Sequence, residues 1–202
     1  MGTTHEAHTQ GNSIADVYRR AQDGFDAILA TIPPDGWDTP SACEDWTVRD
    51  VVGHAVWGQE LVRHLAAGHP YTSRAGAPGA EHPGMLAADQ PLVTWRTARD
   101  ATAAVLTEPA LQMPAPARFV AHPGATLADF LDVLILDYLA HTWDVGHPLG
   151  ITVRLDPDLI AHSRAATDNV VQRGPGMFAP EILPPADADQ QTRWLALLGR
   201  AA

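Results

Sequence analysis

The chain has no lysine and only one cysteine. All 13 basic residues are arginine, and 24 Asp and Glu residues bring the formal net charge to −11. Binding to nucleic acid or to an anionic membrane requires an excess of basic side chains on one face. We therefore expect no nucleic acid and no membrane as partners, and we favour small-molecule ligands. The missing lysine, together with abundant Ala, Gly and Pro, is the bias that GC-rich coding tends to produce, which points to a bacterial host with a high-GC genome.

Long apolar runs are also missing. No stretch approaches the roughly 20 residues that a membrane span needs, and no apolar segment of a signal peptide follows the polar N-terminus. Cys43 has no second cysteine with which to form an internal disulfide. These absences predict a cytoplasmic protein. With 202 residues, 46% of them hydrophobic and 18% charged, the chain is long enough to bury a core without disulfides.

The spacing of the apolar residues predicts an all-α fold. Each expected helix begins at a capping residue or at a proline, and the clearest start is Thr47, which forms a capping box with Asp50. The expected helices cover about 13–32, 47–67, 91–107, 126–146, 157–173 and 190–200. Only 151–155 has strand character. Residues 68–90 are rich in Gly, Pro and Ala without a period, so they predict a long connection that contributes no core and is a usual place for a lid.

Two residues in the most apolar helix predict part of a metal site. Asp137 lies inside the run LILDYLAH, where an unpaired buried carboxylate would cost several kcal/mol. His141 follows four residues later, so both side chains point from one face of the helix. Such a pair can offer two ligands to one ion.

The helix that begins at Thr47 supplies the third ligand. His54 lies on its core-facing stripe, and imidazole with carboxylate suits zinc, nickel, iron or manganese better than calcium. Of these four metals we expect zinc. Three protein ligands would leave positions open for water or substrate. In the alternative interpretation, Asp137 and His141 form a simple ion pair and His54 is a core histidine bonded to a carbonyl. Spacing alone does not separate the two.

Other polar side chains near this site are less specific. Asp144 could orient the imidazole of His141, although pairs at this spacing are more often solvated. His147 suits the end of its helix better than a ligand or a base, and Cys43 suits a small buried apolar side chain better than a reactive thiol. Four tryptophans could form a pocket wall or belong to the plain core. Three arginines could contact a substrate or lie on the solvated surface. These are Trp37, Trp46, Trp57 and Trp143, and Arg49, Arg96 and Arg99.

Several segments carry a family resemblance. The stretch WDTPSACEDWTVRDVVGH at 37–54 resembles the N-terminal signature of the DinB-like metal-binding four-helix bundles, specifically the mycothiol-dependent maleylpyruvate isomerase branch. LDYLAHTWDVGHPLG at 136–150 is similar to the second signature, and residues 174–200 resemble the C-terminal tail of uncharacterised actinobacterial members. The resemblance implies that His54, Asp137 and His141 are the metal ligands. The chain departs from the family at Asp137, where Glu is more usual, and the shorter arm must shift the metal or bind it through water.

The resemblance also implies a domain plan and a function. We expect a disordered N-terminal tail over 1–12, a metal-binding helical bundle over 13–150 and a C-terminal helical extension over 151–202 packed on the bundle. We expect an enzyme, a monomer or homodimer, that uses a mycothiol-like low-molecular-weight thiol for S-transfer to a small electrophile or for its isomerisation. Two alternatives stay open. One is a thiol-independent metal hydrolase or biosynthetic Lewis-acid enzyme, and the other is a noncatalytic metal- or ligand-binding protein.

Overall fold

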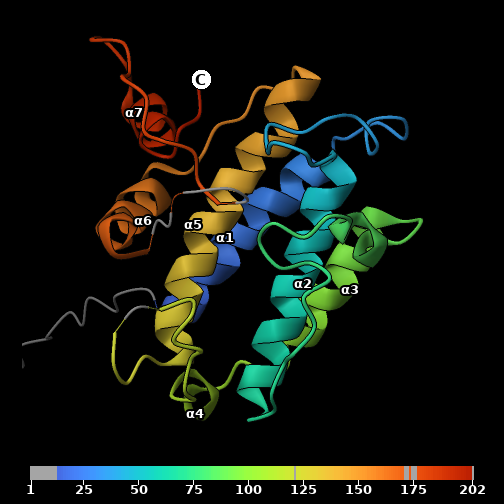
Figure 1. The fold of residues 1–202 in the computed structure, drawn as a ribbon, viewed down its shortest axis with the longest axis vertical. Helices are drawn as coiled ribbons and strands as arrows, with labels where there is room; N and C mark the ends of the chain where they lie inside the picture. The colour runs from blue at the N-terminus through green and yellow to red at the C-terminus, as the bar shows by residue number, and fades with distance from the viewer. Residues whose placement is uncertain (1–12, 121, 171–172, 174–176, 202) are drawn as a thin grey trace, which may run out of the picture.

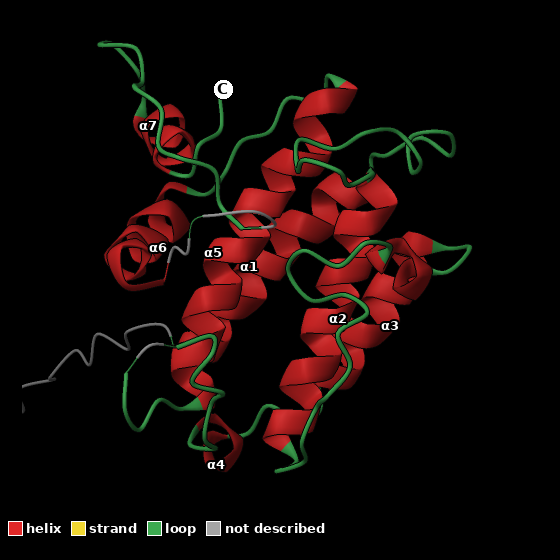
Figure 2. Cartoon of the chain, in the orientation of Figure 1, coloured by secondary structure: helices red, strands yellow, loops and turns green. Residues whose placement is uncertain are grey.

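A computed structural model describes residues 13–120, 122–170, 173 and 177–201 (Figure 1). Within these residues the regular structure is helical, with isolated β-bridges and no strand (Figure 2). The all-α prediction is therefore confirmed, whereas the strand character expected at 151–155 is wrong, because these residues are irregular. The tail expected over 1–12 lies outside the described residues. The α-helices are α1 (Ile14–Leu29), α2 (Val48–Ala66), α3 (Pro91–Ala103), α4 (Glu108–Leu111), α5 (Leu127–Gly146), α6 (Pro157–Val170) and α7 (Gln190–Leu197), with 3-10 turns η1 (Pro83–Ala87) and η2 (His147–Leu149).

The predicted helix starts are confirmed by their capping bonds. Thr47 and Asp50 form the capping box of α2, and Thr126 forms a second one with Asp129 at α5. The helix expected to run from Pro91 to about Thr107 ends earlier, at Ala103. Thr107 instead caps α4, since its hydroxyl accepts the backbone N–H of Ala110 and a proline suits the first turn of the new helix.

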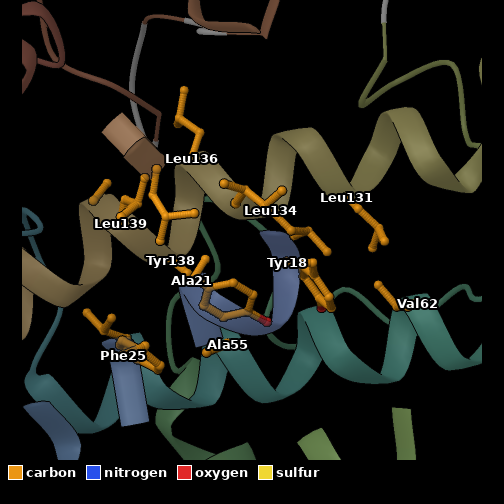
Figure 3. Close-up of a cluster of buried hydrophobic side chains, with 14 of the residues drawn as sticks. Tyr18, Ala21, Phe25, Ala55, Val62, Leu131, Leu134, Leu136, Tyr138 and Leu139 are labelled. Carbon is orange, nitrogen blue, oxygen red and sulfur yellow. The ribbon is translucent and has the colours of Figure 1, made fainter. Parts of the chain in front are cut away.

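Four helices form the bundle: α1 lies along α5, and α2 lies along α3 and also contacts α5 (Figure 1). Their shared core contains Tyr18 and Phe25 of α1, which point toward Tyr138 of α5 (Figure 3). The buried amide of Gln59 on α2 donates to the hydroxyls of Tyr18 and Tyr138, at 3.1 and 2.6 Å. These contacts fix the position of α2 relative to α5, the two helices that carry the candidate ligands.

Helix α5 is buried on two sides. Leu136 points away from the Tyr18 and Tyr138 group (Figure 3), and α6 packs against α5 while α7 packs against α6. The apolar residues Leu159 and Ile160 of α6 and Trp194 and Leu195 of α7 belong to the same core as the bundle. A helix that is apolar around its whole circumference is buried in this way, which explains why α5 is the most apolar segment of the chain.

The connection over 68–90 was expected to contribute no core, and this expectation is wrong. Ala77 and Ala87 are buried, and η1 lies against α2. A Cβ on Gly53 of α2 would lie 1.9 Å from the carbonyl oxygen of Pro83, so only glycine allows this close approach. The backbone N–H of Gly84 also donates to Asp50 at 2.8 Å. The contact rests on small residues and backbone atoms, which carry no periodic apolar signal.

Among the described residues, no helix is both long enough and apolar enough to cross a membrane.

Candidate metal centre

Helices α2 and α5 bring the three predicted ligands together. The carboxylate of Asp137 lies between two imidazoles, with Oδ2 at 3.2 Å from His54 Nε2 and Oδ1 at 3.3 Å from His141 Nε2. The ligand atoms of all three residues lie within 4.8 Å of one another. The capping box of α2 places His54 about two turns from the start of that helix. The packing of α2 on α5 then sets it opposite Asp137 and His141.

The Nδ1 atom of each imidazole, the ring nitrogen that does not face Asp137, lies within hydrogen-bond distance of another residue. His54 Nδ1 lies 2.6 Å from the carbonyl oxygen of Gly76, which can only accept, so Nδ1 carries the proton. His141 Nδ1 lies 2.9 Å from a carboxylate oxygen of Asp144 and donates to it. In the neutral form of each ring, the lone pair is then on Nε2 and faces Asp137. The arrangement presents two nitrogen lone pairs and a carboxylate to one point.

The charges in this cluster balance one another. Burial alone would raise the pKa of Asp137, but the charges and hydrogen bonds of His141 and His54 outweigh it and hold this pKa well below its usual range. Burial likewise lowers the pKa of His141, yet the Asp137 carboxylate and, to a lesser degree, Cys43 and Asp144 raise it well above its ordinary value. The side chains of His54 and His141 are 7% and 8% exposed and that of Asp137 is 22% exposed, so the carboxylate is the ligand that faces solvent.

A second layer surrounds His141. The expectation that Asp144 is solvated is wrong, because its side chain is fully buried and accepts from His141. The same carboxylate accepts hydrogen bonds from both Nε and Nη2 of Arg200, at 2.7 and 2.8 Å. Burial alone would raise the pKa of Asp144, and the Arg200 guanidinium and His141 reverse this and lower it.

Cys43 completes that layer and is more than an apolar side chain. Its thiol donates to Asp144 at 3.1 Å, and Sγ lies 3.6 Å from His141 Nδ1. Burial raises the pKa of this thiol, and the neighbouring Asp144 carboxylate raises it further. The structure thus agrees with the expectation that Cys43 is not a reactive thiolate, but its polar contacts were not anticipated.

Two tryptophans flank the site. The ring of Trp57 stacks on His54 with centroids 6.0 Å apart and planes 19° apart, and Trp46 lies 5.2 Å from His54 on another side. Their indole N–H groups donate to the carbonyls of Ser73 and Ala80, at 2.9 Å each, so the 68–90 connection holds both rings.

The chain matches a known family over most of the bundle. The family is described as mycothiol maleylpyruvate isomerase N-terminal domain, and it matches residues 18–146, which include all three candidate ligands. The chain belongs to this family. The resemblance found in the sequence is therefore confirmed.

Relatives of this mycothiol maleylpyruvate isomerase family member include two mycobacterial proteins. This chain is 33% identical over 199 residues to the uncharacterized protein Rv0738 of Mycobacterium tuberculosis strain H37Rv, and the match covers 91% of this chain and 95% of the relative. The uncharacterized protein Rv0036c of the same strain is 26% identical over 153 residues, covering 70% and 58%. No solved structure matches the chain.

The remaining candidates lie away from the ligands of this family member. Trp143 stacks on His147, with ring centroids 4.2 Å apart, and His147 caps the end of α5 as predicted. Trp37 is partly buried against the core. The three arginines form ion pairs within the chain: Arg49 with Asp38, Arg96 with Asp26 and Arg99 with Asp23. These pairs give the arginines a role in holding elements together.

Two residues of the site were missed in the sequence. Gly76 contributes only a backbone carbonyl, which leaves no signature in side-chain patterns. Arg200 lies 56 positions from Asp144. A buried Asp144 in an apolar helix does predict a cationic partner, but the sequence offers 13 arginines and no means of choosing among them.

Proposed function

We propose that His54, Asp137 and His141 hold one divalent cation, preferably zinc, and that the protein uses it with a mycothiol-like thiol to modify a small electrophile. The observation that carries the metal proposal is that both Nδ1 atoms are engaged by the protein while both Nε2 atoms face one carboxylate. Metal-binding histidines are typically oriented by such outer partners.

The donor set fits the proposed ion. Two imidazoles and one carboxylate suit zinc, with nickel, iron or manganese as alternatives, better than calcium, which prefers oxygen ligands. Three protein ligands leave positions open to water or substrate, and the partial exposure of Asp137 agrees with an opening on that side. Each oxygen of Asp137 faces one histidine, so the shorter arm still reaches both.

The chain supplies no sulfur nucleophile of its own, which favours an external thiol. Cys43 is the only cysteine, and its thiol is held by Asp144 on the outer side of His141 with a raised pKa. A cation bound at the three ligands would stabilise the thiolate of a co-substrate at neutral pH. His54 and His141 contribute fixed Nε2 atoms, and the rings of Trp46 and Trp57 shield His54 from water.

We infer addition as the reaction class. The thiol sulfur forms a bond to an electrophilic carbon, and the proton that the thiol loses returns to the adduct. S-transfer ends at this thioether, whereas isomerisation ends when the new C–S bond breaks and the thiol is released. Family membership supports mycothiol as this thiol, and we extend the proposal to a cytoplasmic monomer or homodimer.

The test combines purified protein, zinc, mycothiol and a panel of small electrophiles, including maleylpyruvate-like cis-enoic acids. We expect the wild-type protein to give a rate above that of the free thiol. His54→Ala and His141→Ala should abolish this increase. Asp132→Asn is the matched control, because Asp132 lies on the same helix and pairs with His162 instead. Activity that persists without thiol would favour a metal hydrolase. If the protein retains zinc but shows no turnover and no thiol binding, the result would favour a noncatalytic binding protein.

A further inference from the structure

Arg200 reaches the buried layer of the site from the end of the chain. Gly199 has φ of +80°, and a Cβ there would lie 2.7 Å from both the Cβ of Ala179 and the carbonyl oxygen of Pro180. The backbone N–H of Arg200 then donates to the carbonyl of Leu195 at 2.9 Å. This tight turn after α7 directs the side chain of Arg200 back toward α5.

Each of the three guanidinium nitrogens donates a hydrogen bond at its destination. Two of its nitrogens form a fork on the carboxylate of Asp144, and Nη1 donates to the carbonyl of Leu198 at 3.0 Å. The group also lies over the ring of Phe178, 5.2 Å from its centroid. The side chain of Arg200 is 12% exposed and that of Asp144 is fully buried. A fork of this kind fixes both the position and the plane of a carboxylate.

The position of that carboxylate matters because it is shared. Oδ2 of Asp144 accepts from Arg200, from His141 Nδ1 and from the thiol of Cys43. Among the described residues, Arg200 alone contacts both oxygens, so it is the group that prevents the carboxylate from rotating about its own bond. Without it, the carboxylate could turn Oδ2 away from the imidazole.

We propose that Arg200 is a positioning residue for the metal centre: it holds Asp144 in one orientation, and Asp144 then keeps Nε2 of His141 directed at Asp137. This inference rests on the proposed metal site. It also makes the C-terminal segment part of a centre whose three ligands all lie within the family match at 18–146.

The test uses the full chain with Arg200→Gln, Arg200→Lys and the control Arg193→Gln. Arg193 is on α7, seven residues before Arg200, and within the described part of the chain it donates to the backbone carbonyls of Ala186 and Ala188. In metal-free protein, we expect the Nδ1 proton of His141, assigned by its absence in His141→Gln, to give a protected downfield NMR signal. Arg200→Gln should lose that signal and Arg193→Gln should keep it. Arg200→Lys, which keeps the charge, should show the signal at reduced intensity.

A double-mutant cycle gives the second measurement. Arg200→Gln should weaken zinc binding about 10–100-fold and change the visible spectrum of the cobalt-substituted protein. In the Asp144→Asn background the same change should have less than about a twofold further effect, since Arg200 acts through Asp144. A merely structural role would give additive losses. The proposal is overturned if Arg200→Gln leaves both the NMR signal and the zinc affinity unchanged, or if the losses add.

The two readouts separate this inference from the proposed function. If the wild-type chain binds no zinc, the proposed metal site fails, and the NMR signal of the metal-free protein still decides whether Arg200 orients His141. If Arg200→Gln does not fold, Arg200→Lys decides: a partial loss of both the NMR signal and the zinc affinity supports the proposal, and a fully retained signal with unchanged zinc affinity overturns it.

Discussion

At the scale of single residues, Asp137 is the side chain on which the candidate centre depends most. Its side chain is one methylene shorter than the Glu that the family resemblance led us to expect here, and each of its oxygens faces one imidazole. The two histidines compensate for the burial of its charge, and this is why its pKa is low. Removing the charge would leave two buried imidazoles without their common partner.

We predict that Asp137→Asn weakens zinc binding by more than the roughly 10–100-fold expected for a change in an outer partner. The amide keeps the size of the side chain but has no negative charge, and one of its two ends donates. Competition with a chelator of known affinity measures the effect. Asp132→Asn, on the same helix, should bind zinc like the wild type, and equal affinities for both variants would contradict the role of Asp137.

At the scale of elements, two helices meet through a buried aromatic pair, Phe25 and Trp95, and two ion pairs. Helices α1 and α3 are joined by Arg96 with Asp26 and by Arg99 with Asp23. The hydrogen bonds from Arg96, at 2.8 Å each, outweigh burial and lower the pKa of Asp26 below its usual range. Arginines that could have met a substrate therefore bridge the bundle.

We predict that Arg96→Ala slightly lowers the free energy of unfolding at pH 7, as for an exposed ion pair, and leaves zinc affinity unchanged. Because the folded-state pKa of Asp26 is lowered, the pair stabilises the fold above the unfolded pKa of about 4, and this contribution is lost as the pH falls through the lower folded value. Urea unfolding between pH 3 and 7 measures the difference between variant and wild type. A difference that stays constant across this range would argue against the pair as its cause.

The contact between α2 and the 68–90 connection allows a second test at this scale. Gly53→Ala places a Cβ 1.9 Å from the carbonyl oxygen of Pro83, so the connection must move, at a cost of about 1–3 kcal/mol. Because Gly76 of the same connection holds His54, zinc affinity should fall as well. Gly24→Ala is the matched control: no atom lies within 4 Å of its Cβ, and it should stabilise α1 by about 0.5–1 kcal/mol. Thermal unfolding and zinc titration of both variants test whether this contact is coupled to zinc binding. A loss of stability in Gly53→Ala with unchanged zinc affinity would contradict the coupling.

At the scale of the whole molecule, the candidate centre draws on four separate parts of the chain. The ligands come from α2 and α5, one outer partner comes from the 68–90 connection, and another is fixed by Arg200 after α7. A bound ion would therefore join segments that are far apart in sequence. Such an ion stabilises the whole fold by mass action.

We predict that zinc at about 100 times its dissociation constant raises the free energy of unfolding by about 2.7 kcal/mol. The combined variant His54→Ala, Asp137→Ala, His141→Ala should show no zinc-dependent stabilisation. Calorimetry with and without zinc, and elemental analysis of the purified proteins, provide the two measurements. Equal metal content in wild type and combined variant would refute the centre.

The sequence by itself determined the helices, the fold class and the three side chains that converge. Caps, prolines and apolar spacing are local signals, and Thr47, Thr126 and the buried Asp137 with His141 on one helix face are read from them directly. His54 required only the added inference that its helix faces the core.

Only the tertiary structure decided which atoms complete the centre. The carbonyl of Gly76 contacts His54, and the thiol of Cys43 lies beside His141. The guanidinium of Arg200 contacts Asp144, the partner of His141, and reaches it through a turn that depends on Gly199. None of these has a period or a fixed spacing, because each depends on how distant segments pack. The same reason explains the missed core at Ala77 and Ala87, where close backbone approach replaces an apolar stripe.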